Sequence, residues 1–160
     1  MTLEGLNEDF RDIVVAFADN GVDFVIVGAY ALAFHGAPRA SGDIDIFVRA
    51  SEANASRIIQ ALNDFGAPLL SHGIAAADFA RPGAVYQLGL PPRRIDVLTE
   101  ISGVTFEEAW ASRVTVDVDG RRAHIIGRDA FLKNKGASGR PKDLADIARV
   151  TKVSSPPRKT

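Results

Sequence analysis

The sequence predicts an α/β (α+β) fold in which helices pack against a mixed, twisted β-sheet. Short apolar runs of the kind that form buried strands occur at residues 23–27, 43–48 and 94–99. Segments with helical periodicity separate these runs, which favours strands joined by crossover helices. An Asp-Gly hairpin signal in the second half adds an antiparallel strand pair, so the sheet is expected to be mixed.

Length and composition favour one globular domain. The chain has 160 residues, 46% hydrophobic and 24% charged, and can bury an apolar core without disulfides. We expect the domain to span residues 1–152 and the polar, proline-containing segment 153–160 to be a disordered tail. The absence of cysteine excludes thiolate metal sites. The acidic N-terminal segment and the lack of an apolar run of about 18 residues favour a cytoplasmic protein without a membrane anchor.

The charge distribution is uneven although the formal net charge is only −1. This small net charge does not indicate binding to nucleic acid. Basic residues nevertheless outnumber acidic ones between residues 121 and 142. This segment either faces an anion or forms a solvated helix face.

The first half of the chain alternates helices with strands. Apolar residues recur at helical spacing, and a glycine follows, in two segments, 7–20 and 52–65. Between them, a strand is expected over residues 23–27 and an alanine-rich helix over residues 29–35. Residues 69–83 are weakly patterned and predict a loop with a short helix around residues 75–79.

The strand predicted over residues 43–48, with the sequence DIDIFV, alternates strictly between acidic or aromatic and aliphatic residues. Asp43, Asp45 and Phe47 therefore share one face of the strand. Cα atoms two residues apart in a strand are separated by about 6.6 Å, so two carboxylates can converge on one or two metal ions. The alternative is that both aspartates lie on the polar outer face of a half-buried sheet.

A third aspartate occurs on a later predicted strand. Residues 84–90 and 94–99 are expected to form two strands, and Asp96 shares a face of the second with Arg94 and Leu98. If this strand lies beside residues 43–48, the three aspartates form a cluster whose mutual repulsion requires bound cations. We treat this adjacency as a hypothesis.

The remaining elements are a short helix, a hairpin and two C-terminal helices. A capping box predicts a helix over residues 105–111, with Trp110 in the core. Asp119 and Gly120 join two hairpin strands, so the acids at this turn are excluded from the site. Two helices should follow, over residues 128–138 and 141–152. The inner face of the second is expected to consist of Leu144, Ile147 and Ala148.

The turn after the first strand is a candidate phosphate site. Gly28 and Ala29 place a backbone without bulky side chains at a helix N-terminus, where free N–H groups and the helix dipole favour an anion. The simpler alternative is that a strand-to-helix turn needs a glycine. Neither the dinucleotide-binding G-x-G-x-x-G pattern nor a P-loop is present.

The order of these motifs, with a glycine turn, then D-x-D on the next strand and one aspartate on a later strand, resembles the nucleotidyltransferase superfamily with a polymerase-β type core. The resemblance covers roughly residues 20–150 and implies the nucleotidyltransferase fold. Three segments are similar to small bacterial nucleotidyltransferases and to abortive-infection type toxin nucleotidyltransferases: VGAYALAFHGAPRASGDIDIFV, LGLPPRRIDVLTEISGVTFEEAW and NKGASGRPKDLADI.

The resemblance implies roles for the three aspartates and for the glycine turn. Asp43 and Asp45 would bind Mg²⁺, or Mn²⁺, and the triphosphate, and Asp96 would bind the second metal and help deprotonate the acceptor hydroxyl. Gly28 and Ala29 would hold phosphates through backbone N–H groups. Ala29 stands where the family often has glycine or serine, so no serine hydroxyl is available there.

The resemblance also implies that Lys135, and with it Asp143, completes the site. An ammonium group can neutralise charge that builds up on the departing pyrophosphate. Arg39 and Ser41 precede the first aspartate and are within reach of phosphate, although a local role in the loop is the alternative for each.

The expected activity is metal-dependent transfer of a nucleoside monophosphate from a nucleoside triphosphate, such as ATP, to a hydroxyl of a protein, an RNA or a small molecule. The similarity to toxins implies a protein partner in a toxin-antitoxin pair. The alternative is a non-catalytic nucleotide-binding or antitoxin-type partner-binding module. A metal-dependent nuclease also uses clustered carboxylates, but hydrolysis does not need the Gly28 turn.

Overall fold

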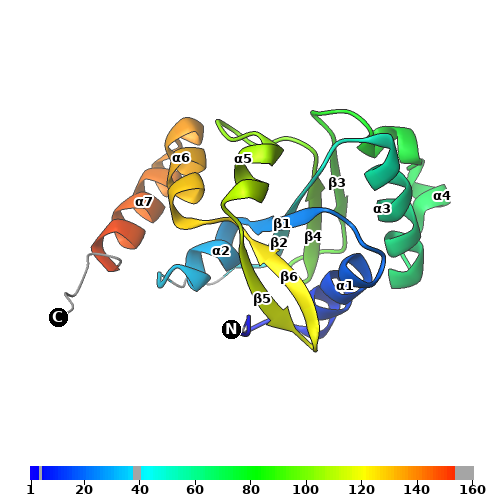
Figure 1. Ribbon diagram of the computed structural model, residues 1–160, viewed down its shortest axis with the longest axis horizontal. Helices are drawn as coiled ribbons and strands as arrows, with labels where there is room; N and C mark the ends of the chain where they lie inside the picture. Colours follow the sequence, from blue (N-terminus) through cyan, green and yellow to red (C-terminus); the bar gives the residue numbers. More distant parts are fainter. Residues whose placement is uncertain (4, 38–40, 154–160) are drawn as a thin grey trace.

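The computed structural model describes residues 1–3, 5–37 and 41–153, and in this part of the chain six strands form one mixed sheet (Figure 1). The strand order is β3-β4-β2-β1-β6-β5. The strands are β1 (Phe24–Val27), β2 (Asp43–Val48), β3 (Val85–Leu88), β4 (Arg94–Leu98), β5 (Val114–Val118) and β6 (Arg121–Ile125). The mixed sheet that the sequence predicts is confirmed.

Strand β2 lies inside the sheet, between β1 and β4. It pairs antiparallel with β1 and parallel with β4. In the parallel pairing Asp45 lies opposite Asp96, and Asp43 lies opposite Arg94. Paired residues on neighbouring strands point to the same face of a sheet, so the three aspartates share one face. The hypothesis that these two strands are neighbours is confirmed.

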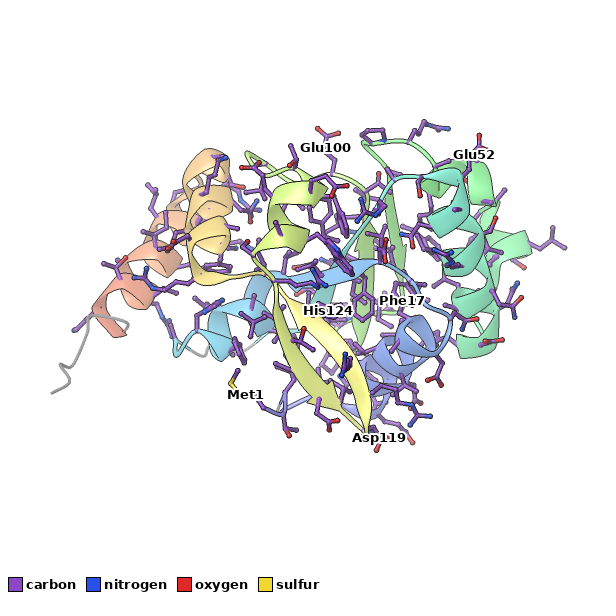
Figure 2. The ribbon with its side chains drawn as sticks, in the orientation of Figure 1. Met1, Phe17, Glu52, Glu100, Asp119 and His124 are labelled. Carbon is purple, nitrogen blue, oxygen red and sulfur yellow. The ribbon has the colours of Figure 1, made fainter. Side chains whose placement is uncertain are left out.

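The opposite face of the sheet is covered by α1 (Glu8–Asp19) and α3 (Glu52–Phe65), which pack against each other (Figure 1). Phe17 of α1 is fully buried and makes an edge contact with Phe24 of β1, with ring centroids 5.6 Å apart. Figure 2 shows Phe17 on the side of α1 that faces the sheet. Both helices agree with their predicted bounds because each carries a regular apolar stripe and a side-chain cap, Asn7 or Ser51.

On the aspartate side of the sheet, α5 (Phe106–Ala111) packs on the strands, and α6 (Arg128–Ser138) is followed by α7 (Pro141–Val153). Phe106 of α5 packs on Phe47 of β2, with ring centroids 5.2 Å apart. Helices α6 and α7 pack against each other at one end of the molecule (Figure 1). Helix α7 ends one residue beyond the expected domain boundary, and residues 154–160 of the expected tail lie outside the described part of the chain.

Three shorter helices complete the fold. Helix α2 (Gly28–Phe34) begins directly where β1 ends. Residues 69–83 contain α4 (Leu69–His72), which the sequence did not predict, and a 3-10 helix, η1 (Ala76–Phe79), close to the expected position. Each of these two turns buries a single apolar residue, Leu69 or Phe79. One buried residue leaves no periodic pattern by which a helix can be recognised.

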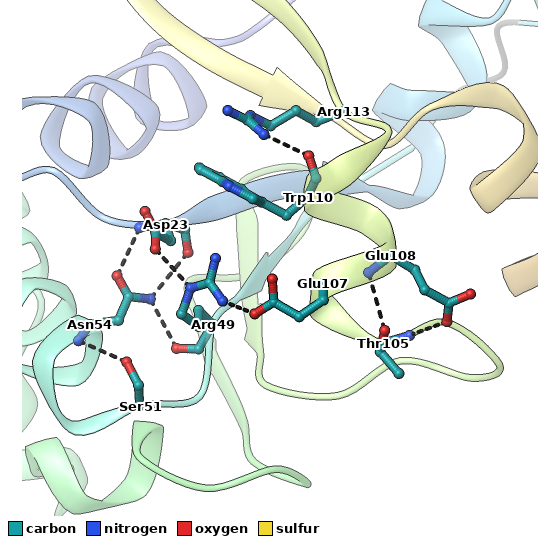
Figure 3. A network of polar contacts seen from close by, with 9 residues as sticks. All are labelled: Asp23, Arg49, Ser51, Asn54, Thr105, Glu107, Glu108, Trp110 and Arg113. Carbon is teal, nitrogen blue, oxygen red and sulfur yellow. Dashed lines mark hydrogen bonds and ion pairs between the residues drawn. The ribbon is translucent and has the colours of Figure 1, made fainter.

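Helix α5 is anchored by a polar network around Arg49, which follows β2 (Figure 3). Arg49 Nε donates to Asp23 Oδ2 at 2.8 Å, its Nη1 pairs with Glu107, and its guanidinium lies 4.8 Å from the centre of the Phe106 ring. Asn54 of α3 donates to the backbone carbonyls of Asp23 and Arg49. The network therefore fixes α5 and the preceding loop relative to β1 and β2.

The prediction that Trp110 lies in the core is only partly correct. Trp110 is half-buried and stacks on Phe106, with ring centroids 5.6 Å apart. The guanidinium of Arg113 covers the ring at 3.8 Å from its centre (Figure 3). A cation-π contact therefore takes the place of apolar packing on one side of the indole.

The predicted inner face of α7 is wrong. The expected core residues are exposed or half-buried: Leu144, Ile147 and Ala148. The buried positions are instead Asp143, Asp146 and Val150, which are 0%, 2% and 0% exposed. The reason is that α7 packs on α6 through a buried charge, because Lys135 of α6 lies within reach of both carboxylates. The pairing with a buried cation thus rotates this helix away from the orientation that apolar periodicity predicts.

The β5–β6 hairpin is confirmed. Asp119 and Gly120 at its turn have φ values of 54° and 81°, the left-handed conformation that a type I′ turn requires. Figure 2 shows Asp119 at the tip of the hairpin, at the end of the molecule opposite Glu100. Across the described ranges, we find no helix that is both long and apolar enough to cross a membrane.

Candidate active site

An open cavity of about 470 Å³ lies on the aspartate face of the sheet. Strands β2 and β4 and the start of α2 form its floor, and α6 and the loop between β4 and α5 form its walls. Asn134 of α6 donates to the carbonyl of Ser102 at 2.9 Å, which ties these two walls together. The cavity contains predicted residues from four separate segments: Gly28, Asp43, Asp45, Asp96 and Lys135.

The three aspartates converge in this cavity. One carboxylate oxygen from each of Asp43, Asp45 and Asp96 lies within 4.8 Å of the other two. Asp96 is 6% exposed, and its buried Oδ1 atom has no hydrogen-bond partner among the described residues. Oxygen ligands of this kind suit Mg²⁺ or Mn²⁺. The donor set and the unpartnered buried oxygen therefore fit a divalent cation, which these three residues would hold.

Burial and the neighbouring carboxylates change the pKa of Asp45. Burial, followed by the negative charges of Asp43 and Asp96, raises the pKa of Asp45 to about 7. The positive charge of Lys135 opposes this shift. Without a cation, one proton therefore remains on Asp45 over much of the acidic range.

Gly28 allows the turn after β1 and also leaves space for a neighbouring carboxylate. Its φ is 71°, which is strained for any residue with a side chain, and a Cβ atom there would overlap the carboxylate of Asp45. Gly28 lines the cavity, whereas Ala29 is 9% exposed and is not among the described lining residues. The structure thus brings only the first residue of the predicted phosphate turn into the cavity.

Ser41 holds the first aspartate in place. Its hydroxyl donates to Asp43 Oδ1 at 2.7 Å, and the backbone N–H of Asp43 donates back to the Ser41 oxygen at 3.3 Å. This is the local loop role that was the alternative to phosphate binding. Arg39, the other residue predicted in this loop, lies outside the described residues.

Lys135 is held by buried carboxylates of α7. Its Nζ atom lies 3.3 Å from Asp143 Oδ1 and 3.5 Å from Asp146 Oδ2. Asp143 also accepts from Arg140 Nε at 2.7 Å. Burial favours the neutral carboxyl, but the hydrogen bond from Arg140 and the charge of Lys135 lower the pKa of Asp143 below its ordinary value. Asp143 thus does not line the cavity but contacts two residues that do, Lys135 and Arg140.

The sequence did not reveal the importance of Arg94, Arg140 and Asp146. Alternation placed Arg94 on the face of Asp96, but only the register with β2 shows that it contacts Asp43 as well. Asp146 follows Asp143 by one helical turn, which was the available signal that both carboxylates face the same way. Arg140 lines the cavity beside Lys142 in the basic segment.

Comparison with a solved structure supports the assignment of the fold. The crystal structure of an antigenic nucleotidyltransferase-like protein from Paracoccidioides brasiliensis is similar to this chain, with a TM-score of 0.51 and 18% sequence identity. The match covers 94% of this chain and 79% of that one. At this identity the likeness concerns the fold, which is of the nucleotidyltransferase type.

The family is shown by a sequence model that covers most of the fold. The model described as nucleotidyl transferase AbiEii toxin, type IV toxin-antitoxin system, matches residues 12–127, more than half of the chain. The chain therefore belongs to this nucleotidyltransferase family. The match includes all three aspartates and ends before Lys135. No curated protein matches the chain.

Proposed function

We propose that this chain transfers a nucleoside monophosphate from a nucleoside triphosphate to a hydroxyl acceptor, with Mg²⁺ or Mn²⁺ held by Asp43, Asp45 and Asp96. The observation that carries the proposal is the convergence of three carboxylates from two parallel strands on one cavity. Gly28 and the ammonium group of Lys135 line the same cavity. Membership of a nucleotidyltransferase family favours transfer over hydrolysis.

Each residue of the cavity has a separate role in the proposed reaction. The backbone of Gly28 and the ammonium group of Lys135 bind the triphosphate, and Lys135 offsets negative charge on the departing pyrophosphate. Asp143 and Asp146 orient the ammonium group of Lys135 through ion pairs. Asp96 accepts the proton of the attacking hydroxyl. When bound, the divalent cation would stabilise negative charge on the attacking and leaving oxygens.

The identity of the acceptor and of a partner is a further part of the proposal. The acceptor hydroxyl belongs to a protein, an RNA or a small molecule, and the net charge of −1 disfavours an extended nucleic-acid surface. The toxin-antitoxin description of the family supports an antitoxin protein that opposes this activity. Purification of the tagged chain from its own cells would reveal an antitoxin that binds it directly.

A labelling experiment tests the transfer. The purified chain is incubated with cell extract, Mg²⁺ and each of the four α-labelled nucleoside triphosphates in turn. We expect one or more nucleotides to label a discrete acceptor, and the Asp43→Asn and Asp45→Asn variants to abolish labelling because each removes a charged metal ligand. The labelled molecule identifies the acceptor.

The matched control is Asp119→Asn, which makes the same chemical change at the hairpin tip, away from the cavity. Asparagine tolerates the left-handed conformation found there, so this variant should fold and transfer label normally. Normal labelling by both the Asp43→Asn and Asp45→Asn variants would refute the assignment of the site. Failure of all four nucleotides to bind in calorimetry with Mg²⁺ would favour the non-catalytic module that acts by binding a partner.

A further inference from the structure

A guanidinium group already contacts two of the proposed metal ligands. Arg94 begins β4 and lies opposite Asp43 in the pairing with β2. Its Nη2 atom donates to Asp43 Oδ2 at 2.7 Å and to Asp96 Oδ2 at 3.1 Å. A single nitrogen of Arg94 therefore bridges carboxylates from two neighbouring strands.

These contacts do not have the geometry of the strongest arginine-carboxylate pairs. A guanidinium binds a carboxylate best through two parallel hydrogen bonds, whereas Arg94 uses Nη2 for both aspartates. Its Nε atom is buried and has no hydrogen-bond partner among the described residues. The side chain is 33% exposed, so its outer part borders the open cavity. Arg94 thus neutralises the aspartates through contacts that another cation can replace.

We infer that Arg94 is a tethered competitor of the divalent cation, which neutralises Asp43 and Asp96 in the metal-free protein and thereby sets how tightly the metal binds. The inference rests on the proposed metal site and adds a residue that controls its affinity. Two cations that share the same carboxylates repel each other at short range. Metal binding must therefore displace Arg94 or overcome its charge.

In the metal-free protein, the contacts of Arg94 with the aspartates stabilise the fold. Asp96 is almost fully buried and lies directly opposite Asp45. Without a neighbouring positive charge, the carboxylates would repel one another in a partly desolvated site. Arg94 reduces this repulsion until a divalent cation replaces it. Removal of its charge should therefore weaken the metal-free fold and strengthen metal binding.

The test compares the wild type with the Arg94→Gln variant, which keeps a polar side chain and removes the charge. Calorimetry measures Mn²⁺ binding without nucleotide, and thermal unfolding is followed with and without Mn²⁺. We expect Arg94→Gln to unfold at a lower temperature without metal and to bind Mn²⁺ about tenfold more tightly, which corresponds to about 1.4 kcal/mol. Mn²⁺ should raise its unfolding temperature more than that of the wild type.

A second variant keeps the test decisive if Arg94→Gln does not fold. Arg94→Lys retains the charge but loses the planar group that bridges the two aspartates. Its Mn²⁺ affinity should lie between those of the wild type and Arg94→Gln. If Arg94→Gln does not fold, the Arg94→Lys variant decides the test. Mn²⁺ binding by Arg94→Lys that is no tighter than that of the wild type then overturns the inference.

The outcomes separate this inference from the proposed function. If the wild type and Arg94→Gln bind Mn²⁺ equally, or if the variant binds it more weakly, Arg94 does not compete and the inference is wrong while the metal site stands. If neither protein binds Mn²⁺, both the metal site and the inference are wrong. The Asp96→Asn variant should lose Mn²⁺ binding, which would show that the heat measured by calorimetry comes from binding at the three aspartates.

Discussion

At the scale of single residues, Gly28 links the backbone turn to the carboxylate cluster. Its positive φ excludes most side chains, and its missing Cβ leaves space for the Asp45 carboxylate. Gly21 has a similar φ of 66° but no atom within 4 Å of the position that a Cβ would take. A comparison of substitutions at these two glycines therefore distinguishes the effect of backbone strain from the effect of a new contact with Asp45.

We predict that Gly21→Ala and Gly28→Ala both lower the free energy of unfolding, by about 1–2 kcal/mol for the backbone strain alone. Only Gly28→Ala should also weaken Mn²⁺ binding, because the new methyl group displaces the carboxylate of Asp45. Chemical denaturation and calorimetry measure the two effects. Equal Mn²⁺ affinity in the two variants would show that Asp45 can move without loss of the site.

The raised pKa of Asp45 predicts a pH dependence of stability. The folded protein holds this proton with a pKa of about 7, compared with an ordinary value of 3.8. Because the folded state binds the proton more tightly, the free energy of unfolding of the metal-free protein should fall as the pH rises between these two values. The Asp45→Asn variant should lack this contribution. Denaturation at several pH values measures it.

Asp119→Asn serves as the control for this pH series, because its carboxylate lies outside the cluster. An Asp45→Asn variant that kept the full pH slope of the wild type would contradict the assignment of the raised pKa to Asp45. Addition of Mn²⁺ to the wild type should reduce the slope, since the cation favours the ionised carboxylate.

At the scale of secondary-structure elements, α6 and α7 are joined by a charge that neither apolar pattern reveals. Lys135 of α6 is 6% exposed and lies between two buried aspartates of α7. Leu144, which has the spacing of a core residue, is 54% exposed. Desolvated charges are stable only when paired, so this contact sets the rotation of α7 about its axis.

We predict that Asp143→Asn destabilises the fold by about 3–5 kcal/mol, the usual effect of removing one partner from a buried ion pair. The same change at Asp129, whose side chain is 98% exposed in the first turn of α6, should lower the free energy of unfolding by about 1 kcal/mol or less, because its pair with Arg128 is exposed. Urea denaturation of both variants checks this difference. Equal stability of the two variants would show that Asp146 alone suffices to hold Lys135.

At the scale of the whole molecule, the sheet order assembles the site from distant segments. The crossover through α3 places β4 beside β2, and the chain returns through β6 to place α6 over the same cavity. The basic segment between residues 121 and 142 is divided by this arrangement. Lys135, Arg140 and Lys142 line the cavity, whereas Arg121 pairs with Asp19 at the hairpin. Only its C-terminal part therefore lies where an anion could bind, and that role stays a prediction.

The sequence by itself determined the elements whose signals are local. Alternation over residues 43–48 predicts the strand and the shared face of Asp43 and Asp45, and caps and apolar stripes predict α1 and α3 almost to the residue. These signals depend on neighbours within a few positions along the chain, which is why they can be recognised without the fold.

Only the tertiary structure decided which distant residues meet. The pairing of Asp45 with Asp96, the bridge from Arg94 to Asp43, and the closeness of Gly28 to Asp45 all depend on strand register. The inner face of α7 depends on Lys135 of another helix. Such contacts join residues far apart in the chain, and their energies come from burial and charge pairing that exist only after folding.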